Sequence, residues 1–184
     1  MRVIAGKARR LQLKAPKGAS TRPTTDRIKE TLFNMIQDEL YEIHFLDLFS
    51  GSGAIGIEAL SRGAASACFV EQNKEAAGII RENLQFTHLS LQAEVMNCTA
   101  ISAISMLQGK ERFHVVFMDP PYGKGLEKEV LRFSPFYEIL EEKALIIVEA
   151  DLDTQLSMED IRGFRILKEK VYKTNTVSYT HLRA

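Results

Sequence analysis

Two turns in the sequence combine residue types that could do chemistry on a polar ligand. The first, Asp119-Pro120-Pro121-Tyr122, directly follows the apolar run 113–118. A carboxylate at the carboxyl end of a buried parallel strand lies where open α/β sheets bind ligands. The two prolines stiffen the turn and remove two N–H donors, which leaves the Pro120 carbonyl able to accept from a ligand. The Tyr122 ring offers a face on which a base can stack.

This turn suits methyl transfer to the exocyclic amine of a nucleobase. Such an amine is a poor nucleophile because its lone pair is delocalised into the ring. The Asp119 carboxylate and the Pro120 carbonyl could hold both amine protons and direct the lone pair at a methyl donor. Asp119 could also stabilise the developing charge and take the proton. The alternative is a purely structural turn in which Asp119 caps a helix and Tyr122 packs.

The second turn is rich in glycine and lies between an expected strand and an expected helix. Residues 47–56 read DLFSGSGAIG and contain the pattern G-x-G-x-x-G. Glu71 follows Gly53 by 18 residues (71 − 53), near the roughly 20 at which an acid binds ribose hydroxyls. These features fit a nucleotide-like cofactor. A dinucleotide dehydrogenase and a tight turn that binds nothing remain alternatives.

Asp47 favours one cofactor over the other. A carboxylate just before the glycines repels an anionic pyrophosphate but suits a cationic ligand. S-adenosylmethionine has no phosphate, carries a sulfonium and an amino group, and has a ribose diol. We therefore expect S-adenosylmethionine rather than NAD. Asn97 stands where a polar side chain could reach the adenine, although ordinary turn chemistry explains an Asn there equally well.

Strands and helices alternate from residue 43 onward, which predicts a parallel sheet covered on both faces. The expected strands are 45–49, 67–71, 91–96, 113–118 and 144–148. The expected helical segments are 51–60 (a turn and helix), 73–84, 100–107 and 125–140, the last interrupted at Ser134-Pro135. Residues 164–172 and 176–180 are typical of a hairpin, so we expect the sheet to end in an antiparallel pair.

The charge is distributed unevenly, although the net charge is +0. Residues 1–36 carry 9 basic and 2 acidic side chains, which is 9 − 2 = +7, and the remainder carries 15 − 22 = −7. A basic segment joined to an acidic body suggests contact with a polyanion. Residues 3–6 and 11–13 predict a small hairpin, and 24–36 a helix with N-cap residues at its start. The alternative is a solvated tail.

Composition excludes several classes of protein. The 184 residues are 45% apolar and 26% charged, which is typical of a globular domain. No apolar run reaches the roughly 18 residues of a membrane span, and no secretory signal is visible. We therefore expect a cytoplasmic protein with no membrane partner. The scattered Cys68, Cys98 and four histidines lead us to expect neither a disulfide nor a bound metal.

Together these segments resemble a known family. DLFSGSG (47–53) and DPPY (119–122) are similar to motifs of S-adenosylmethionine-dependent amino-methyltransferases. RVIAGKARRLQL (2–13) and TRPTTDRIKETLFNMI (21–36) resemble the N-terminal signature of RsmD-type bacterial 16S rRNA (guanine-N2)-methyltransferases. The resemblance covers residues 1–180. The sequence departs from the family at Asn97, where an acid is more usual, and at 178–184, where the last strand usually ends on an aromatic residue.

The resemblance implies a Rossmann-like class I methyltransferase with a mostly parallel, seven-stranded sheet. It also implies N2 methylation of one guanine of 16S rRNA, the guanine 966-type site, in the small ribosomal subunit or its assembly intermediate. We expect a monomer with an N-terminal extension (1–40) that binds RNA, a methyltransferase domain (41–180) and a tail (181–184) that extends no pattern.

The residue chemistry and the resemblance together lead us to expect roles for individual residues. The expected catalytic residues are Asp119, Pro120 and Tyr122. The expected cofactor contacts are Asp47, Ser50, Gly51, Gly53, Glu71, Gln72 and Asn97. The expected substrate contacts are Arg9, Arg10, Arg22, Pro121, Tyr122 and Lys124.

Other activities explain the sequence less well. An NAD-dependent oxidoreductase or a non-catalytic RNA-binding module leaves one or both turns unexplained. A methyltransferase acting on DNA adenine usually has a larger recognition region, and one acting on protein glutamine prefers Asn at position 119. Methylation of another rRNA or tRNA guanine stays open.

Overall fold

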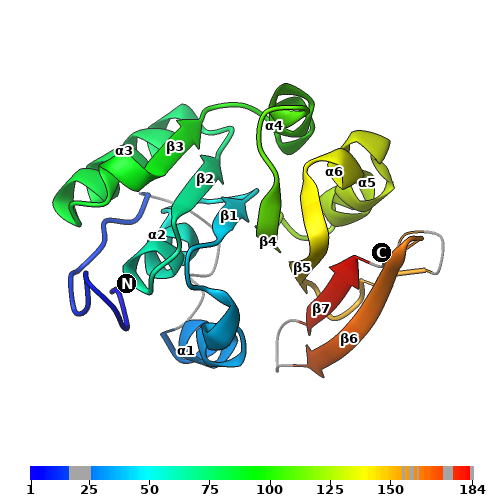
Figure 1. Ribbon diagram of the computed structural model, residues 1–184, viewed down its shortest axis with the longest axis horizontal. Coiled ribbons are helices and arrows are strands. Elements are labelled where there is room, and N and C mark those ends of the chain that lie inside the picture. Colours follow the sequence, from blue (N-terminus) through cyan, green and yellow to red (C-terminus); the bar gives the residue numbers. More distant parts are fainter. Residues whose placement is uncertain (17–25, 155, 158–159, 161, 172–175, 183–184) are drawn as a thin grey trace.

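Strands of the alternating pattern assemble into one sheet, shown in Figure 1 in the order β3-β2-β1-β4-β5-β7-β6. The strands are β1 (His44–Asp47), β2 (Ser66–Val70), β3 (Ala93–Met96), β4 (Phe113–Met118), β5 (Leu140–Ala150), β6 (Phe164–Val171) and β7 (Thr176–Leu182). Strands β1 to β5 pair in parallel, and β7 pairs antiparallel with both β5 and β6. The predicted Rossmann-like α/β fold is confirmed.

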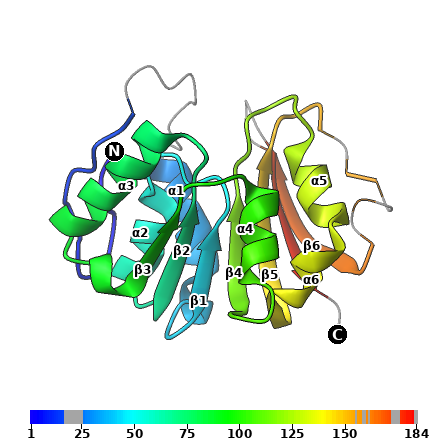
Figure 2. The same cartoon turned by 90° about the horizontal axis from the view of Figure 1, so that it is seen from above.

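The structure, a computed structural model, describes residues 1–16, 26–154, 156–157, 160, 162–171 and 176–182. Its α-helices are α1 (Asp26–Met35), α2 (Ala54–Ser61), α3 (Lys74–Phe86), α4 (Ala100–Leu107), α5 (Leu126–Arg132) and α6 (Ser134–Glu138). Two short 3₁₀ turns, η1 (Gln37–Glu39) and η2 (Ser90–Gln92), complete the elements. Helices α1 to α3 contribute to the core on one face of the sheet and α4 to α6 to the core on the other (Figures 1 and 2).

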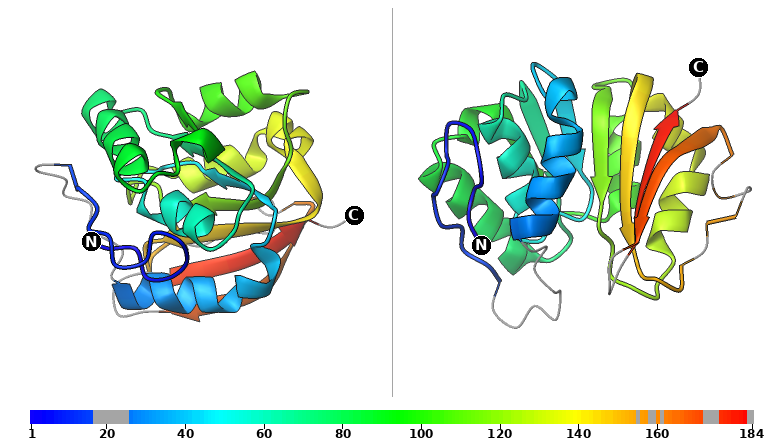
Figure 3. Two further views of the ribbon diagram at one scale, coloured as in Figure 1. Left: turned by 60° about the vertical axis from the view of Figure 1, so that its left-hand side comes forward. Right: turned by 90° about the horizontal axis from the view of Figure 1, so that it is seen from below.

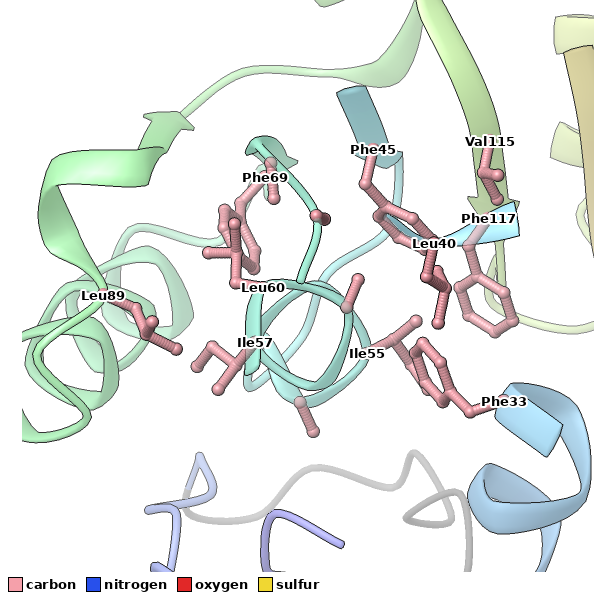
Figure 4. Close-up of a cluster of buried hydrophobic side chains, with 14 of the residues drawn as sticks. Phe33, Leu40, Phe45, Ile55, Ile57, Leu60, Phe69, Leu89, Val115 and Phe117 are labelled. Carbon is pink, nitrogen blue, oxygen red and sulfur yellow. The ribbon is translucent and has the colours of Figure 1, made fainter. Parts of the chain in front are cut away.

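The apolar strands have two buried faces, which explains their continuous hydrophobic runs. In β4, Val115 and Phe117 belong to the core beneath α1 to α3, and Val116 and Met118 to the core beneath α4 to α6. Helix α2 is buried along its whole length. Figure 4 shows side chains of α1 and of the sheet gathered around this helix. The first turn of α2 is therefore anchored from several directions.

Most predicted strand limits are shifted by one to a few residues in the structure, and two of these differences have a clear physical reason. Strand β3 begins at Ala93 rather than Leu91, because Ser90–Gln92 form a 3₁₀ turn that leaves Leu91 exposed. The expectation that residues 181–184 extend no pattern is wrong for its first half, since β7 continues to Leu182. His181 pairs with Leu145 of β5, and Leu182 with Phe164 of β6. A ladder of backbone hydrogen bonds does not require the apolar side chains on which the prediction relied.

The N-terminal arm, residues 1–14, lies against α2 and α3 (Figure 3). Its two predicted strands reduce to a single antiparallel bridge between Arg2 and Gln12. The backbone N–H groups of Ile4 and Ala5 donate instead to the Glu58 carboxylate, at 2.8 and 3.0 Å. These two N–H groups of the arm therefore bind a side chain of α2 instead of extending the ladder of a hairpin. The helix-start signal at 24–25 lies outside the described residues.

Glu58 lies at the centre of a buried ion cluster. Its carboxylate lies 3.3 Å from Lys29 Nζ of α1 and 2.8 Å from Arg62 Nε, and the Glu58 and Lys29 side chains have no exposed surface. Lys29 also donates to the carbonyl oxygen of Arg2. The Arg62 guanidinium stacks on Phe33 at 5.0 Å from the ring centroid. One carboxylate therefore connects the arm, α1 and α2.

We predict that Glu58→Ala lowers the free energy of unfolding by about 3–5 kcal/mol, because it removes the carboxylate that lies 3.3 Å from the buried Lys29 ammonium. Urea unfolding measures the loss. Glu82→Ala is the control, because Glu82 forms an exposed ion pair with Lys14, and we expect a change below about 1 kcal/mol. A similar small effect for Glu58→Ala would contradict the role assigned to the cluster.

Candidate active site

The carboxyl ends of β1 and β4 diverge at a topological switch point. Strand β1 pairs with β2 on one side and β4 on the other, so the strand order reverses there. Open α/β sheets bind ligands in the crevice at such a reversal. Asp47 ends β1, and Asp119 follows the last residue of β4. The two predicted turns are therefore brought to the same edge.

Asp47 is buried beneath the glycine-rich turn, with 1% of its surface exposed. Its Oδ2 accepts from the N–H of Gly56, at 3.2 Å, in the first turn of α2. Its Oδ1 has no hydrogen-bond partner among the described residues. The pKa of Asp47 is raised to about 7, mainly by burial; the hydrogen bond from Gly56 N–H lowers the pKa, and the nearby Glu71 carboxylate raises it. With its pKa raised in this way, Asp47 repels a pyrophosphate less strongly than a fully ionised carboxylate would.

Two glycines are required by the geometry of the turn. Gly53 precedes α2 with φ 77, in the left-handed region that residues with a Cβ rarely adopt. A Cβ on Gly56 would lie 2.3 Å from Cε1 of Phe69, so α2 could not pack this closely on β2. A Cβ on Gly51 would meet no heavy atom within 4 Å among the described residues. The backbone at Gly51 therefore has room for a ligand beside it.

Glu71 connects the two turns at the ends of β1 and β2. Its Oε2 accepts from Gly51 N–H at 2.9 Å, and its Oε1 from Asn73 N–H at 2.7 Å. Ser50 closes the first turn, because its Oγ donates to the Asp47 carbonyl at 2.7 Å and its carbonyl accepts from Gly53 N–H at 2.7 Å. Glu71 therefore lies beside the glycines, and a ligand that engages its carboxylate competes with these backbone donors.

Asn97 is held by the turn after β2. Its Nδ2 donates to the carbonyls of Glu71 and Gln72, at 2.8 and 3.1 Å. Both Asn97 and Gln72 are exposed. The structure thus gives Asn97 the turn role that the sequence left open, and its contact with adenine stays a prediction.

Asp119 is partly buried and lies close to two other carboxyl groups. Burial is the largest effect that raises its pKa, to about 8, followed by the negative charges of Glu149 and Asp47. Burial and these charges therefore favour the neutral carboxylic acid over the ionised form of Asp119 in the ligand-free protein. A nearby cation would favour the ionised form.

Glu149 is a residue that the sequence interpretation missed. It belongs to β5, is 5% exposed, and follows Val148, the register partner of Met118 in β4. Because alternate residues of a strand share a face, Glu149 lies on the same face as Ile147, beneath α1 to α3. The signal was present in the sequence, since an acid directly after Ile146-Ile147-Val148 obeys the rule that identified Asp119.

The remaining predicted contacts fall into two groups. Near Asp119, Pro120 is buried and Pro121 partly buried, while Tyr122, at 46%, and Lys124 are exposed. Arg9 and Arg10 are exposed, but their turn contacts the far end of α2, where Ala8 N–H donates to Ser61 Oγ. Helix α2, about 12 Å long for its eight residues, separates their turn from the glycine-rich turn. Arg22 lies outside the described residues.

Within the described residues, no group of three or more His, Cys, Asp or Glu side chains is arranged to hold a metal ion. None of the helices in this part of the chain is both long enough and apolar enough to cross a membrane.

The carboxylate acceptors and the open backbone of the site fit S-adenosylmethionine. The buried Oδ1 of Asp47 has no protein donor in the described structure, and a ligand cation nearby would offset its charge. Gly51 leaves space beside the backbone, and the Glu71 carboxylate is within reach of that space.

Comparisons with known proteins bear on the family and the fold. The family model described as Conserved hypothetical protein 95 matches residues 1–181. A Haemophilus influenzae relative, Ribosomal RNA small subunit methyltransferase D, is 38% identical over 180 residues, which are 97% of this chain and 91% of that protein. The chain belongs to the RsmD family of rRNA methyltransferases.

Solved structures agree with this family assignment. A proposed Escherichia coli methyltransferase, yhhF, is 32% identical with a TM-score of 0.85, and the match covers 100% of this chain and 98% of that one. Streptococcal SMU.776, crystallised with SAH, is 16% identical with a TM-score of 0.65 over 81% of this chain and 49% of that one. The latter likeness concerns the fold alone, and the fold is that of S-adenosylmethionine-dependent methyltransferases.

We predict that Asp119→Asn stabilises the ligand-free protein, increasingly so at higher pH. The pKa of Asp119 is about 8 in the folded protein and near 4 in the unfolded chain. The folding stability of the native protein therefore falls as the pH rises between these two values. An amide carries no such penalty. The melting temperature of Asp119→Asn relative to the native protein should therefore rise from pH 5 to pH 8.5. An equal difference at both pH values would contradict the raised pKa.

Proposed function

We propose that this chain transfers a methyl group from S-adenosylmethionine to the exocyclic N2 amine of one guanine of 16S rRNA, the guanine 966-type site, in the small ribosomal subunit or its assembly intermediate. The observation that carries the proposal is the position of Asp119-Pro120-Pro121-Tyr122 at the switch point beside Asp47. The names of the family's curated members support a small-subunit rRNA substrate. Because that substrate is ribosomal, we expect the protein to act in the cytoplasm.

On the cofactor side, S-adenosylmethionine supplies an electrophilic methyl group on a positively charged sulfur. Asp47 and the backbone at Gly51 and Gly53 orient the cofactor, and Glu71 accepts from its ribose hydroxyls. Ser50, Gln72 and Asn97 shape the surrounding turns through the hydrogen bonds described above.

On the substrate side, the Asp119 carboxylate and the Pro120 carbonyl accept the two N2 protons and hold the amine in line with the methyl group. Stacking on Tyr122 fixes the plane of the base, with Pro121 and Lys124 beside it. Positive charge develops on nitrogen during transfer, and the ionised Asp119 stabilises it and accepts the released proton. The negative charges of Glu149 and Asp47 raise the proton affinity of Asp119, which suits a base.

The RNA contact is assigned to the N-terminal extension. The arm docks through its backbone, so the exposed Arg9 and Arg10 remain directed at solvent. Their distance from the glycine-rich turn means that they position the rRNA backbone rather than the target base. Arg22 is a further proposed phosphate contact.

We predict that Asp119→Ala lowers the methyl-transfer rate by about 10²–10⁴-fold while the Kd for S-adenosylmethionine changes by less than about threefold. Transfer of a tritiated methyl group is measured to naked rRNA, small subunits and 70S particles, followed by nucleoside analysis for N2-methylguanosine. The exposed Asp153→Ala serves as the control and should retain full activity. Loss of cofactor binding with Asp119→Ala, or a different methylated nucleoside with the native protein, would refute the proposal.

Replacing Arg9 and Arg10 with Gln should weaken rRNA binding and make the plot of log K against log salt shallower by about 1.5 units, since about 0.7–0.9 units accompany each phosphate contact. Filter binding at several salt concentrations measures the slope. The exposed Arg165 of β6 offers a control of the same charge. An Arg9 and Arg10 variant with the native slope would remove the arm from the RNA interface.

A further inference from the structure

Asn83 of α3 joins the arm to the glycine-rich turn. Its side chain exchanges two hydrogen bonds with the backbone of Lys14: Lys14 N–H donates to Oδ1 at 2.9 Å, and Nδ2 donates to the Lys14 carbonyl at 3.0 Å. The same Nδ2 donates to the carbonyl of Ser52 at 2.9 Å. Asn83 is 1% exposed, so these groups have little access to water that could replace the bonds.

Ser52 is the residue between the two glycines proposed to approach the cofactor. Its peptide group is held at both ends, because its carbonyl accepts from Asn83 and the following N–H, that of Gly53, donates to the Ser50 carbonyl at 2.7 Å. A turn containing Gly51 and Gly53 has little conformational preference of its own. Its shape therefore depends on bonds from other segments: Glu71 accepts from Gly51 N–H, Met1 Sδ of the arm accepts from Ser52 Oγ at 3.5 Å, and Asn83 donates to the Ser52 carbonyl.

The orientation of the Asn83 amide depends in turn on the arm. A primary amide can present either its oxygen or its nitrogen at a given position, and the pair of bonds with Lys14 selects one orientation. In that orientation Nδ2 faces Ser52. Without Lys14 N–H, Oδ1 would lose its partner and the amide would be held less tightly.

We propose that Asn83 is a positioning residue that makes the docked arm part of the cofactor site, so that affinity for S-adenosylmethionine depends on the arm. The inference rests on the proposed function only in taking S-adenosylmethionine as the ligand of the turn. It also gives the N-terminal extension a role at the cofactor, separate from its proposed contact with rRNA.

A matched pair of substitutions at Lys14 tests the proposal without altering Asn83 or the turn. Lys14→Pro removes the N–H that Asn83 accepts, and it also removes the exposed ion pair with Glu82. Lys14→Ala removes the ion pair alone. We expect isothermal titration of the full chain with S-adenosylmethionine, in the absence of RNA, to give a Kd about three- to fivefold higher for Lys14→Pro than for Lys14→Ala.

Asn83→Ala extends the test to both sides of the amide. We expect the KM for S-adenosylmethionine to rise about tenfold, while kcat at saturating cofactor stays within about twofold. The double variant Asn83→Ala with Lys14→Pro should bind S-adenosylmethionine no more weakly than Asn83→Ala, because both changes break the same connection from Lys14 through the Asn83 amide to Ser52. Ser61→Ala removes two other arm hydrogen bonds at the far end of α2 and controls for general loosening; its Kd should stay within twofold of the native value.

Equal Kd values for Lys14→Pro and Lys14→Ala would overturn the inference, and this comparison holds even if Asn83→Ala fails to fold. Additive losses in the double variant would overturn it too, since the arm would then act by another route. Melting temperatures show that each protein is folded at the temperature of titration. If the native chain itself does not bind S-adenosylmethionine, the proposed function fails rather than the coupling.

Discussion

Burial of carboxyl groups at the carboxyl edge of the sheet is the constraint on which the site depends. Asp47, Asp119 and Glu149 come from three adjacent strands, and an ionised carboxylate in such surroundings is unfavourable unless something compensates it. The protein compensates in part, since Asp47 accepts from a backbone N–H at the start of α2. The remaining cost appears as pKa values of about 7 for Asp47 and about 8 for Asp119. A cationic ligand and an amine substrate are suited to such a site.

The arm extends this arrangement by docking with its backbone rather than its side chains. Buried acceptors on α2 and α3, namely Glu58, Ser61 and Asn83, take the backbone N–H groups of the arm. Backbone docking leaves the sequence of the arm free to carry exposed basic residues. It also joins the arm to the helix that begins at the glycine-rich turn. The segment proposed to hold rRNA and the turn proposed to hold the cofactor are thus packed on the same two helices.

The features predicted correctly from the sequence depend on local chemistry. Gly53 needs its left-handed backbone conformation whatever surrounds the turn. Runs such as Phe113–Met118 are apolar on both faces, so they read as buried parallel strands. The sequence did not lead us to predict a role for Glu149 or Asn83, although the position of each is informative. Glu149 directly follows the apolar run 144–148, and Asn83 lies on the apolar face of α3 beside Ile80 and Leu84.

The sequence by itself determined the class of fold, the two turns with the residue types that they carry, and the division into basic and acidic parts, because short-range pattern and residue type suffice for these. The tertiary structure alone decided which charges meet. It placed Asp119 beside Glu149 and Asp47, turned Asn97 toward the backbone, ended β7 at Leu182, and set Arg9 and Arg10 at the far end of α2. Burial and pairing between distant segments depend on strand order and helix packing, which no local pattern specifies.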